Sequence, residues 1–83
     1  MARYSVETRL EPEAAIRKAV AYFGAEGLGL EAIEQNPCCF HFQGGGGHVA
    51  ATAYKEGKKT ILELETREWD RQVREFMRLV GRS

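Results

Sequence analysis

Two alternating runs on either side of four consecutive glycines constrain the fold of this chain most strongly. The run 38–43 precedes Gly44–Gly47, and the run 48–54 follows them. Successive side chains of a strand point to opposite faces, so each run predicts a strand with one buried face. Two such runs joined by a short glycine segment are typical of a β-hairpin, and we expect its four-residue loop to be loose.

The alternation also predicts which side chains of the hairpin face the core. The inward set is Cys38, Phe40, Phe42, Val49, Ala51 and Ala53. A register slip of one residue would put both phenylalanines in water, so this set should face a common core. The opposite, open face would then carry Cys39, His41, Gln43, His48, Ala50, Thr52 and Tyr54.

A third strand is predicted over residues 59–66, after a charged turn that contains Gly57. Its alternation places Leu62 and Leu64 inward, while Ile61, Glu63 and Glu65 point to the open face. The sequence therefore indicates three antiparallel strands in series, each with one solvated face.

The first half of the chain predicts one strand, one helix and a second, irregular strand. Residues 3–10 alternate as a half-buried strand. Residues 12–26 have apolar positions at helical spacing and begin with Pro12, and Gly27 is the expected left-handed cap. Residues 28–35 form the next predicted strand. Its apolar residues Leu28 and Ile33 do not share one parity, which indicates a β-bulge.

The last predicted element is a helix over residues 67–80. Thr66 is the expected N-cap, and Gly81 follows the helix. The helix has the most hydrophobic face in the chain, formed by Trp69, Val73, Phe76, Met77 and Val80. We expect this face to lie across the small side chains Ala51 and Ala53 of the hairpin.

The resulting order is strand, helix, four strands, helix, in one domain over residues 1–83. It predicts an α+β, two-layer sandwich: a five-stranded antiparallel sheet with both helices on one face, and the first strand paired with the last. This order resembles the TATA-binding-protein-like topology, of which the larger helix-grip domains (START and Bet v 1 type) are an elaborated form. The resemblance spans the chain in topology alone, without a signature motif, so it assigns no functional residue.

Charge and hydropathy narrow the classes of partner. Twelve basic residues balance twelve acidic ones, which argues against a dedicated nucleic-acid binder. Arginines recur along the last predicted helix at positions Arg67, Arg71, Arg74, Arg78 and Arg82. Acidic residues are interleaved with them, so a solvated helix face is the simpler interpretation. No apolar run approaches the ~18 residues of a membrane span, and no signal peptide is evident, so we expect a cytoplasmic protein.

Catalysis and metal binding have weak support. Cys39, His41 and His48 share the open face and could ligate zinc or copper, but their spacing matches no recognised metal motif. Residues two apart on a strand lie about 6.5–7 Å apart, too far for Cys39 to be activated directly by His41. The adjacent cysteines Cys38 and Cys39 are a poor arrangement for a structural disulfide. We therefore expect a non-catalytic protein without a cofactor.

Two binding hypotheses remain. The favoured one is a homodimer, or a contact with another protein, through the open sheet face; its expected interface is Tyr54, Ile61, His41 and Thr52. The alternative is a small apolar ligand held between the last helix and the sheet. Its expected pocket is lined by Trp69, Phe76, Ala51 and Ala53.

Overall fold

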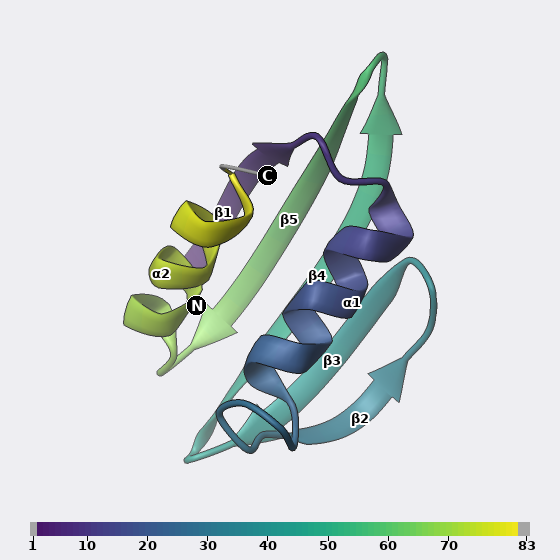
Figure 1. Cartoon of the computed structure of the whole chain (residues 1–83). Helices are drawn as coiled ribbons and strands as arrows, with labels where there is room; N and C mark the ends of the chain where they lie inside the picture. The colour runs from purple at the N-terminus through teal and green to yellow at the C-terminus, as the bar shows by residue number, and fades with distance from the viewer. Residues whose placement is uncertain (1, 82–83) are drawn as a thin grey trace.

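The computed structural model describes residues 2–81, and the elements follow the predicted order (Figure 1). The strands are β1 (Ala2–Thr8), β2 (Glu31–Gln35), β3 (Cys39–Gly44), β4 (Gly47–Glu56) and β5 (Lys59–Arg67). The helices are α1 (Pro12–Phe23) and α2 (Asp70–Val80). The α+β class is confirmed. No helix of the described residues is long and apolar enough to cross a membrane.

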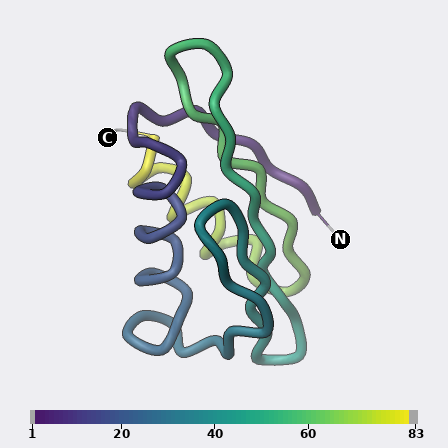
Figure 2. Tube along the Cα trace, turned by 90° about the vertical axis from the view of Figure 1, so that its right-hand side faces the viewer, coloured from purple at the N-terminus to yellow at the C-terminus, as the bar shows by residue number. Residues whose placement is uncertain are grey.

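The five strands form one sheet in the order β1-β5-β4-β3-β2, and every neighbouring pair is antiparallel. β1 pairs with β5, as the sequence predicted, so β1 and β2 are the two edges. α1 connects these edges, and both helices lie on the same face of the sheet (Figure 2). The predicted two-layer arrangement is confirmed.

The alternation along the strands correctly predicted the buried face. Phe40, Phe42, Val49, Leu62 and Leu64 are each at most 2 % exposed and belong to one hydrophobic cluster. Cys38 is the exception in the hairpin. It precedes β3 and is exposed, because the chain is still turning from β2 into β3 at that point.

The prediction that the last helix covers the hairpin alanines is wrong. α1 packs mainly against β4 and also against β3 and β5, whereas α2 packs against β1 and β5 (Figure 1). α1 crosses the sheet from one edge to the other and therefore passes over its middle. Only Glu68 and Trp69 connect β5 to α2, so α2 stays beside the strand that it follows. Ala51 and Ala53 lie buried under α1, where their small side chains permit close packing.

The hairpin turn is tighter than the sequence predicted. β3 extends to Gly44 and β4 begins at Gly47, and these two glycines are paired. The turn itself is Gly45 and Gly46, which have φ angles of 58° and 80°. Two central residues with positive φ are the requirement of a type I′ hairpin turn, and glycine adopts this conformation without a steric cost.

α1 ends earlier than predicted. The helix stops at Phe23 with Gly24 as its C-cap, and the chain then turns until β2 begins at Glu31. The positive φ in this segment belongs to Gly29, at 83°, and not to Gly27. The predicted bulge is confirmed, because the register between β2 and β3 shifts between Ala32 and Glu34.

α2 begins later than predicted, at Asp70, and Trp69 is its N-cap residue. Thr66 remains in β5, where its hydroxyl donates a 2.8 Å hydrogen bond to the carbonyl of His48. The indole Nε1 of Trp69 donates a 2.9 Å hydrogen bond to the carbonyl of Gly44. The side chain of Trp69 therefore connects the start of α2 to the glycine turn. Trp69 precedes the helix and is not part of its apolar face.

Candidate functional site

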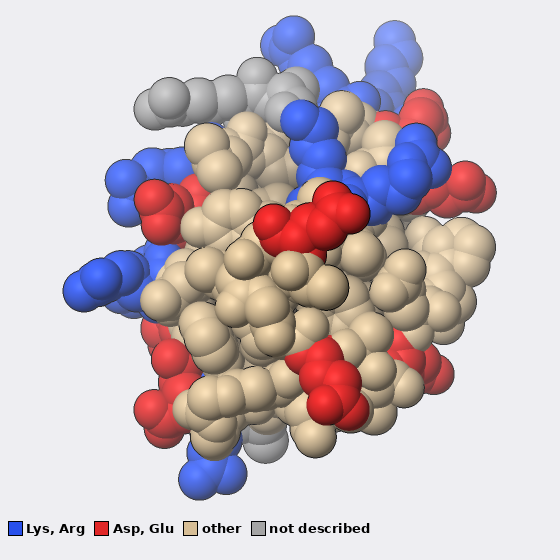
Figure 3. Space-filling view, turned by 60° about the horizontal axis from the view of Figure 1, so that its bottom comes forward, with Lys and Arg blue, Asp and Glu red and all other residues tan. Residues whose placement is uncertain are grey.

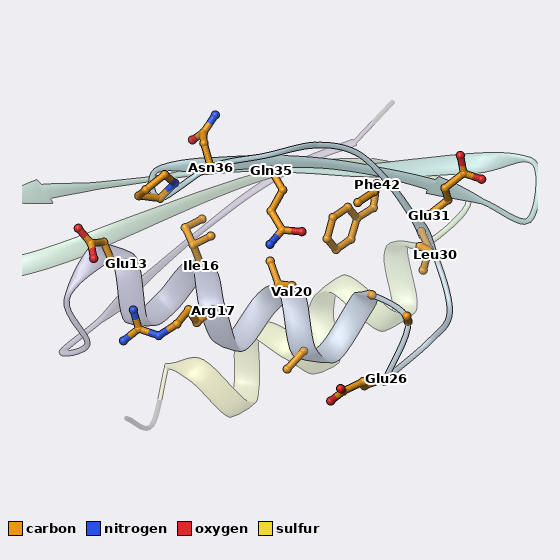
Figure 4. Close-up of a pocket in the computed structure, with 15 residues that line it drawn as sticks. Glu13, Ile16, Arg17, Val20, Glu26, Leu30, Glu31, Gln35, Asn36 and Phe42 are labelled. Carbon is orange, nitrogen blue, oxygen red and sulfur yellow. The ribbon is translucent and has the colours of Figure 1, made fainter.

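A groove of about 900 Å³ runs between α1 and the edge strand β2 (Figure 4). It exists because α1 covers β3 and β4, while β2 lies beyond the helix. All five residues of β2 are exposed, including those that point to the helix side of the sheet. The groove is thus the part of the helix face that no helix covers.

The lining of the groove is mainly apolar. Its apolar side chains come from α1, β2, β3 and the turns before and after β2: Ile16, Val20, Ala21, Ala25, Leu30, Ala32, Pro37 and Phe42. Ile16, Leu30 and Phe42 are at most 4 % exposed and form the floor. Val20 is half-buried and Ala32 is exposed, and these two stand on opposite sides, on the helix and on the strand. An apolar molecule in this groove would remove both side chains from water.

One polar side chain projects into the apolar part. Gln35 of β2 pairs in register with Phe40, which places it on the helix side of the sheet. Its amide points into the space between the sheet and α1, near Val20 and Phe42 (Figure 4). A glutamine amide offers both a donor and an acceptor, so it can fix the orientation of a bound molecule.

Charged side chains stand at the two ends of the groove. Glu13 and Arg17 lie toward one end, and Glu26 and Glu31 toward the other (Figure 4). No ion pair found among residues 2–81 involves any of these four. Glu31 pairs with Gln43 and so points to the open face, which leaves the carboxylates of Glu13 and Glu26 against one guanidinium. This small excess of negative charge favours a neutral or cationic ligand over an anionic one.

The turn that ends β2 also borders the groove, through Asn36 and Pro37. The side-chain oxygen of Asn36 accepts a 3.1 Å hydrogen bond from the backbone N–H of Cys38. Cys38 and Cys39 are joined by a disulfide, so the sequence argument against a bond between them is wrong. That argument rested on the adjacency of the two cysteines, and the structure bonds these two neighbours within the turn between β2 and β3.

The four residues of the predicted ligand pocket do not surround a common space. Ala51 and Ala53 lie under α1, and the ring of Trp69 lies against Gly45 at the hairpin turn. Phe76 is 2 % exposed, and its ring centroid is 5.4 Å from that of Phe23 in the core. The structure therefore places a groove on the other side of α1 from the predicted one.

The three residues considered as metal ligands are brought only partly together. The ring centroids of His41 and His48 are 5.4 Å apart, and His48 Nε2 is 3.9 Å from Glu65 Oε1. The sulfur of Cys39 is bonded to Cys38. Within residues 2–81, no three His, Cys, Asp or Glu side chains are grouped closely enough to hold a metal ion.

The open face carries the residues of the predicted interface, but it is more polar than the sequence suggested. Tyr54 is 38 % exposed, Thr52 is exposed and His41 is half-buried. Ile61 points to this face but is only 8 % exposed, between its cross-strand neighbours Tyr54 and Glu7. Ile61 therefore offers little surface to a partner.

The described arginines near the C-terminus are solvated, as the sequence predicted. Arg71, Arg74 and Arg78 of α2 are exposed, as is Arg67 at the end of β5, and Arg82 lies outside the described residues. Viewed from the lower end of the molecule, basic side chains stand mainly toward the margins of a broad uncharged surface in which a few acidic side chains are set (Figure 3). This view shows no single large basic patch.

Comparison with known proteins assigns the chain to no family. No protein-family model matches the chain, and no curated protein is significantly similar to it. Sequence reasoning missed this site, although one signal pointed to it: the apolar residues of 28–35 lacked a common face, as expected for a strand that is not fully packed.

Proposed function

We propose that this protein is a non-catalytic binding domain, and that its groove between α1 and β2 holds an elongated, mainly apolar ligand that is neutral or cationic. The apolar groove itself is the observation that supports this proposal. Its volume of about 900 Å³ lies within the range of roughly 300–1,000 Å³ that is typical of small-molecule sites. The amide of Gln35 supplies the polar contact that such sites use for orientation.

The residue types of the lining favour binding over catalysis. The groove is lined by no Ser, Thr, Cys, His, Lys or Tyr residue. The usual nucleophiles are therefore missing from it, as is the side chain that most often acts as a general base near neutral pH. The carboxylates do not form a close acid–base pair: Glu13 lies toward the end opposite to Glu26 and Glu31, and Glu31 lies on the far side of the sheet from Glu26 (Figure 4).

The proposal is tested with three probes of equal chain length: decyltrimethylammonium, decanol and decanoate, each below its micelle concentration. We expect the amide signals of Val20, Ala32 and Gln35 to shift in two-dimensional NMR titrations. The cation and the alcohol should bind more tightly than the carboxylate, because the rim is negatively biased. Shifts spread evenly over the whole chain would contradict the proposal.

Two variants of β2 provide a matched control. Ala32→Trp places a large side chain in the groove, whereas Glu34→Trp places the same side chain on the opposite face, beside His41. Ala32→Trp should weaken binding at least ~10-fold, equivalent to ~1.4 kcal/mol, and Glu34→Trp should change it little. Equal effects of the two variants would show that the probes do not occupy the groove.

Self-association through the open face is the second candidate, and the exposed Tyr54 on β4 supports it. Glu63 and Glu65 lie on the neighbouring strand of the same face, so two copies would bring carboxylates together. Sedimentation equilibrium at micromolar concentration tests this candidate. Twice the mass of 9.3 kDa, reduced to the monomer mass by Tyr54→Asp, would support it, and a monomer throughout would reject it.

A further inference from the structure

β2 has one free backbone edge. One side of the strand pairs with β3, and no described strand pairs with the other side. The unpaired N–H and C=O groups of an edge strand can bind an extended peptide, which then continues the sheet. The five residues of β2 set the length of such a pairing.

The two edges of the sheet differ in what lies on their helix side. At β1, the helix side is occupied by α2, and the hydroxyl of Tyr4 donates a 2.6 Å hydrogen bond to Asp70 of that helix. At β2, the helix side is the open groove. A strand added at β2 therefore finds space for its side chains, whereas α2 already fills that layer at β1.

An added strand would lie about 4.8 Å from β2 and would alternate its side chains between the two faces. Every second side chain would enter the layer between the sheet and α1, beside the apolar groove. Ile33, a residue of β2 that is 51 % exposed, lies on this edge strand. It would lose water contact if a partner chain covered the edge.

The charges around β2 indicate which charge a partner should carry. Glu31 and Glu34 pair in register with Gln43 and His41, and so point to the open face of the sheet. Glu26 stands at the end of the groove, and Arg17 is the one basic residue of the groove lining. Basic side chains on the partner complement this arrangement. A second copy of β2 would instead oppose its own glutamates.

We propose that the ligand of the groove is an extended peptide with alternating apolar and basic side chains, which adds to β2 as a sixth strand. Its apolar side chains fill the groove, and its basic side chains lie toward Glu31 and Glu34. This inference rests on the groove being the binding site, as proposed above, and it names the class of ligand.

The direct test is calorimetric titration of the full chain with the peptide Lys-Val-Lys-Val-Lys-Val-Lys. We expect saturable binding that weakens as salt is added, and no binding of the peptide in which glutamate replaces lysine. Two N-methylated forms test the backbone contact, one methylated at the valines and the other at the lysines. Along a strand, the N–H groups of alternate residues point to opposite edges. One form should therefore lose binding at least ~10-fold, while the other retains it.

Charge reversal at the two edges supplies matched variants. Glu34→Lys, at the β2 edge, should weaken binding of the lysine peptide several-fold. Glu7→Lys, at the β1 edge, makes the same change in net charge and should leave binding unchanged. Ala32→Trp, which fills the groove, should abolish the titration signal. Equal effects of the two charge reversals would overturn the inference.

The outcomes separate this inference from the proposed function. If decyltrimethylammonium binds in the groove but the lysine peptide does not bind, the groove remains a small-ligand site and strand addition is rejected. If both N-methylated peptides bind like the parent, side chains alone hold the peptide and strand addition is again rejected. If neither probe nor peptide binds, both proposals fail.

Discussion

β5 and β2 belong to the same sheet, yet their environments are opposite. β5 lies between β1 and β4 and buries residues of both faces, whereas every residue of β2 is exposed. Residue type does not explain the difference, because the polar Thr60 of β5 is 1 % exposed and the apolar Ile33 of β2 is 51 % exposed. Position in the sheet decides burial here. The central strand β5 is covered by neighbouring strands and by helices, whereas the β2 edge is left uncovered.

The largest expected effect comes from truncating one apolar side chain in each strand. Leu62→Ala in β5 should lower the free energy of unfolding by about 2–5 kcal/mol, because Leu62 is fully buried. Ile33→Ala in β2 should change it by less than ~0.5 kcal/mol. Urea unfolding followed by far-ultraviolet circular dichroism measures both. A similar loss in the two variants would mean that β2 is packed as firmly as β5.

A smaller effect is expected at the glycine turn. Gly45→Ala and Gly46→Ala both place a side chain at positive φ, which costs roughly 1–2 kcal/mol. A Cβ at position 45 would also stand 2.9 Å from Cζ2 of Trp69, whereas no atom lies within 4 Å of a Cβ at position 46. Gly45→Ala should therefore be the less stable variant in urea unfolding.

Trp69 is the single tryptophan of the chain, so its fluorescence reports the same contact. The emission should shift in Gly45→Ala and stay unchanged in Gly46→Ala. Equal stability and equal emission of the two variants would show that Trp69 does not pack on the turn.

The smallest effect is expected at β1, the edge strand whose helix side is occupied by α2. The hydrogen bond from Tyr4 to Asp70, together with burial and the negative charge, raises the pKa of Tyr4 above its ordinary value. The raised pKa favours the neutral hydroxyl in the folded state. The stabilisation that the contact between Tyr4 and Asp70 provides is therefore complete below about pH 10. It is lost as the pH rises through the raised pKa of Tyr4.

As the pH rises from about 8 to 11, the free energy of unfolding should fall less in Tyr4→Phe than in the native protein. Urea unfolding at each pH measures this free energy. Asp70→Asn is the matched variant, because it keeps Tyr4 but removes the charged acceptor of its hydroxyl. It should flatten the pH dependence in the same way as Tyr4→Phe. If both variants keep the native pH dependence, the contact between Tyr4 and Asp70 does not hold β1 against α2.

Much of the fold could be predicted because strand alternation is a local property. Phe40 and Phe42 had to share a face whatever their partners, and the bulge near Ile33 followed from the broken parity of its segment. The packing of the helices could not be predicted in this way. Trp69 fits the apolar period of α2, but its hydrogen bond to Gly44 depends on a residue 25 positions away.

The groove could not be predicted from residue types. Ala51 and Ala53 suggested free space beneath a helix. Small residues also permit a helix to approach closely, and in this structure α1 packs closely on the two alanines. The free space lies instead beside Ala32 and Gln35, where the helix layer ends before the sheet does. The width of the sheet relative to its two helices is a property of the whole molecule and has no signature in a short segment.

The disulfide between Cys38 and Cys39 has a consequence for how the protein responds to its chemical surroundings. A cross-link stabilises a fold chiefly by closing a long loop of the unfolded chain, and a bond between adjacent residues closes none. The fold therefore does not depend on an oxidising environment, and a thiol reductant should leave the unfolding midpoint in place while adding two hydrogen atoms to the mass. Redox chemistry at this turn should therefore act on the local backbone beside Asn36 and Pro37 and leave the five-stranded sheet in place.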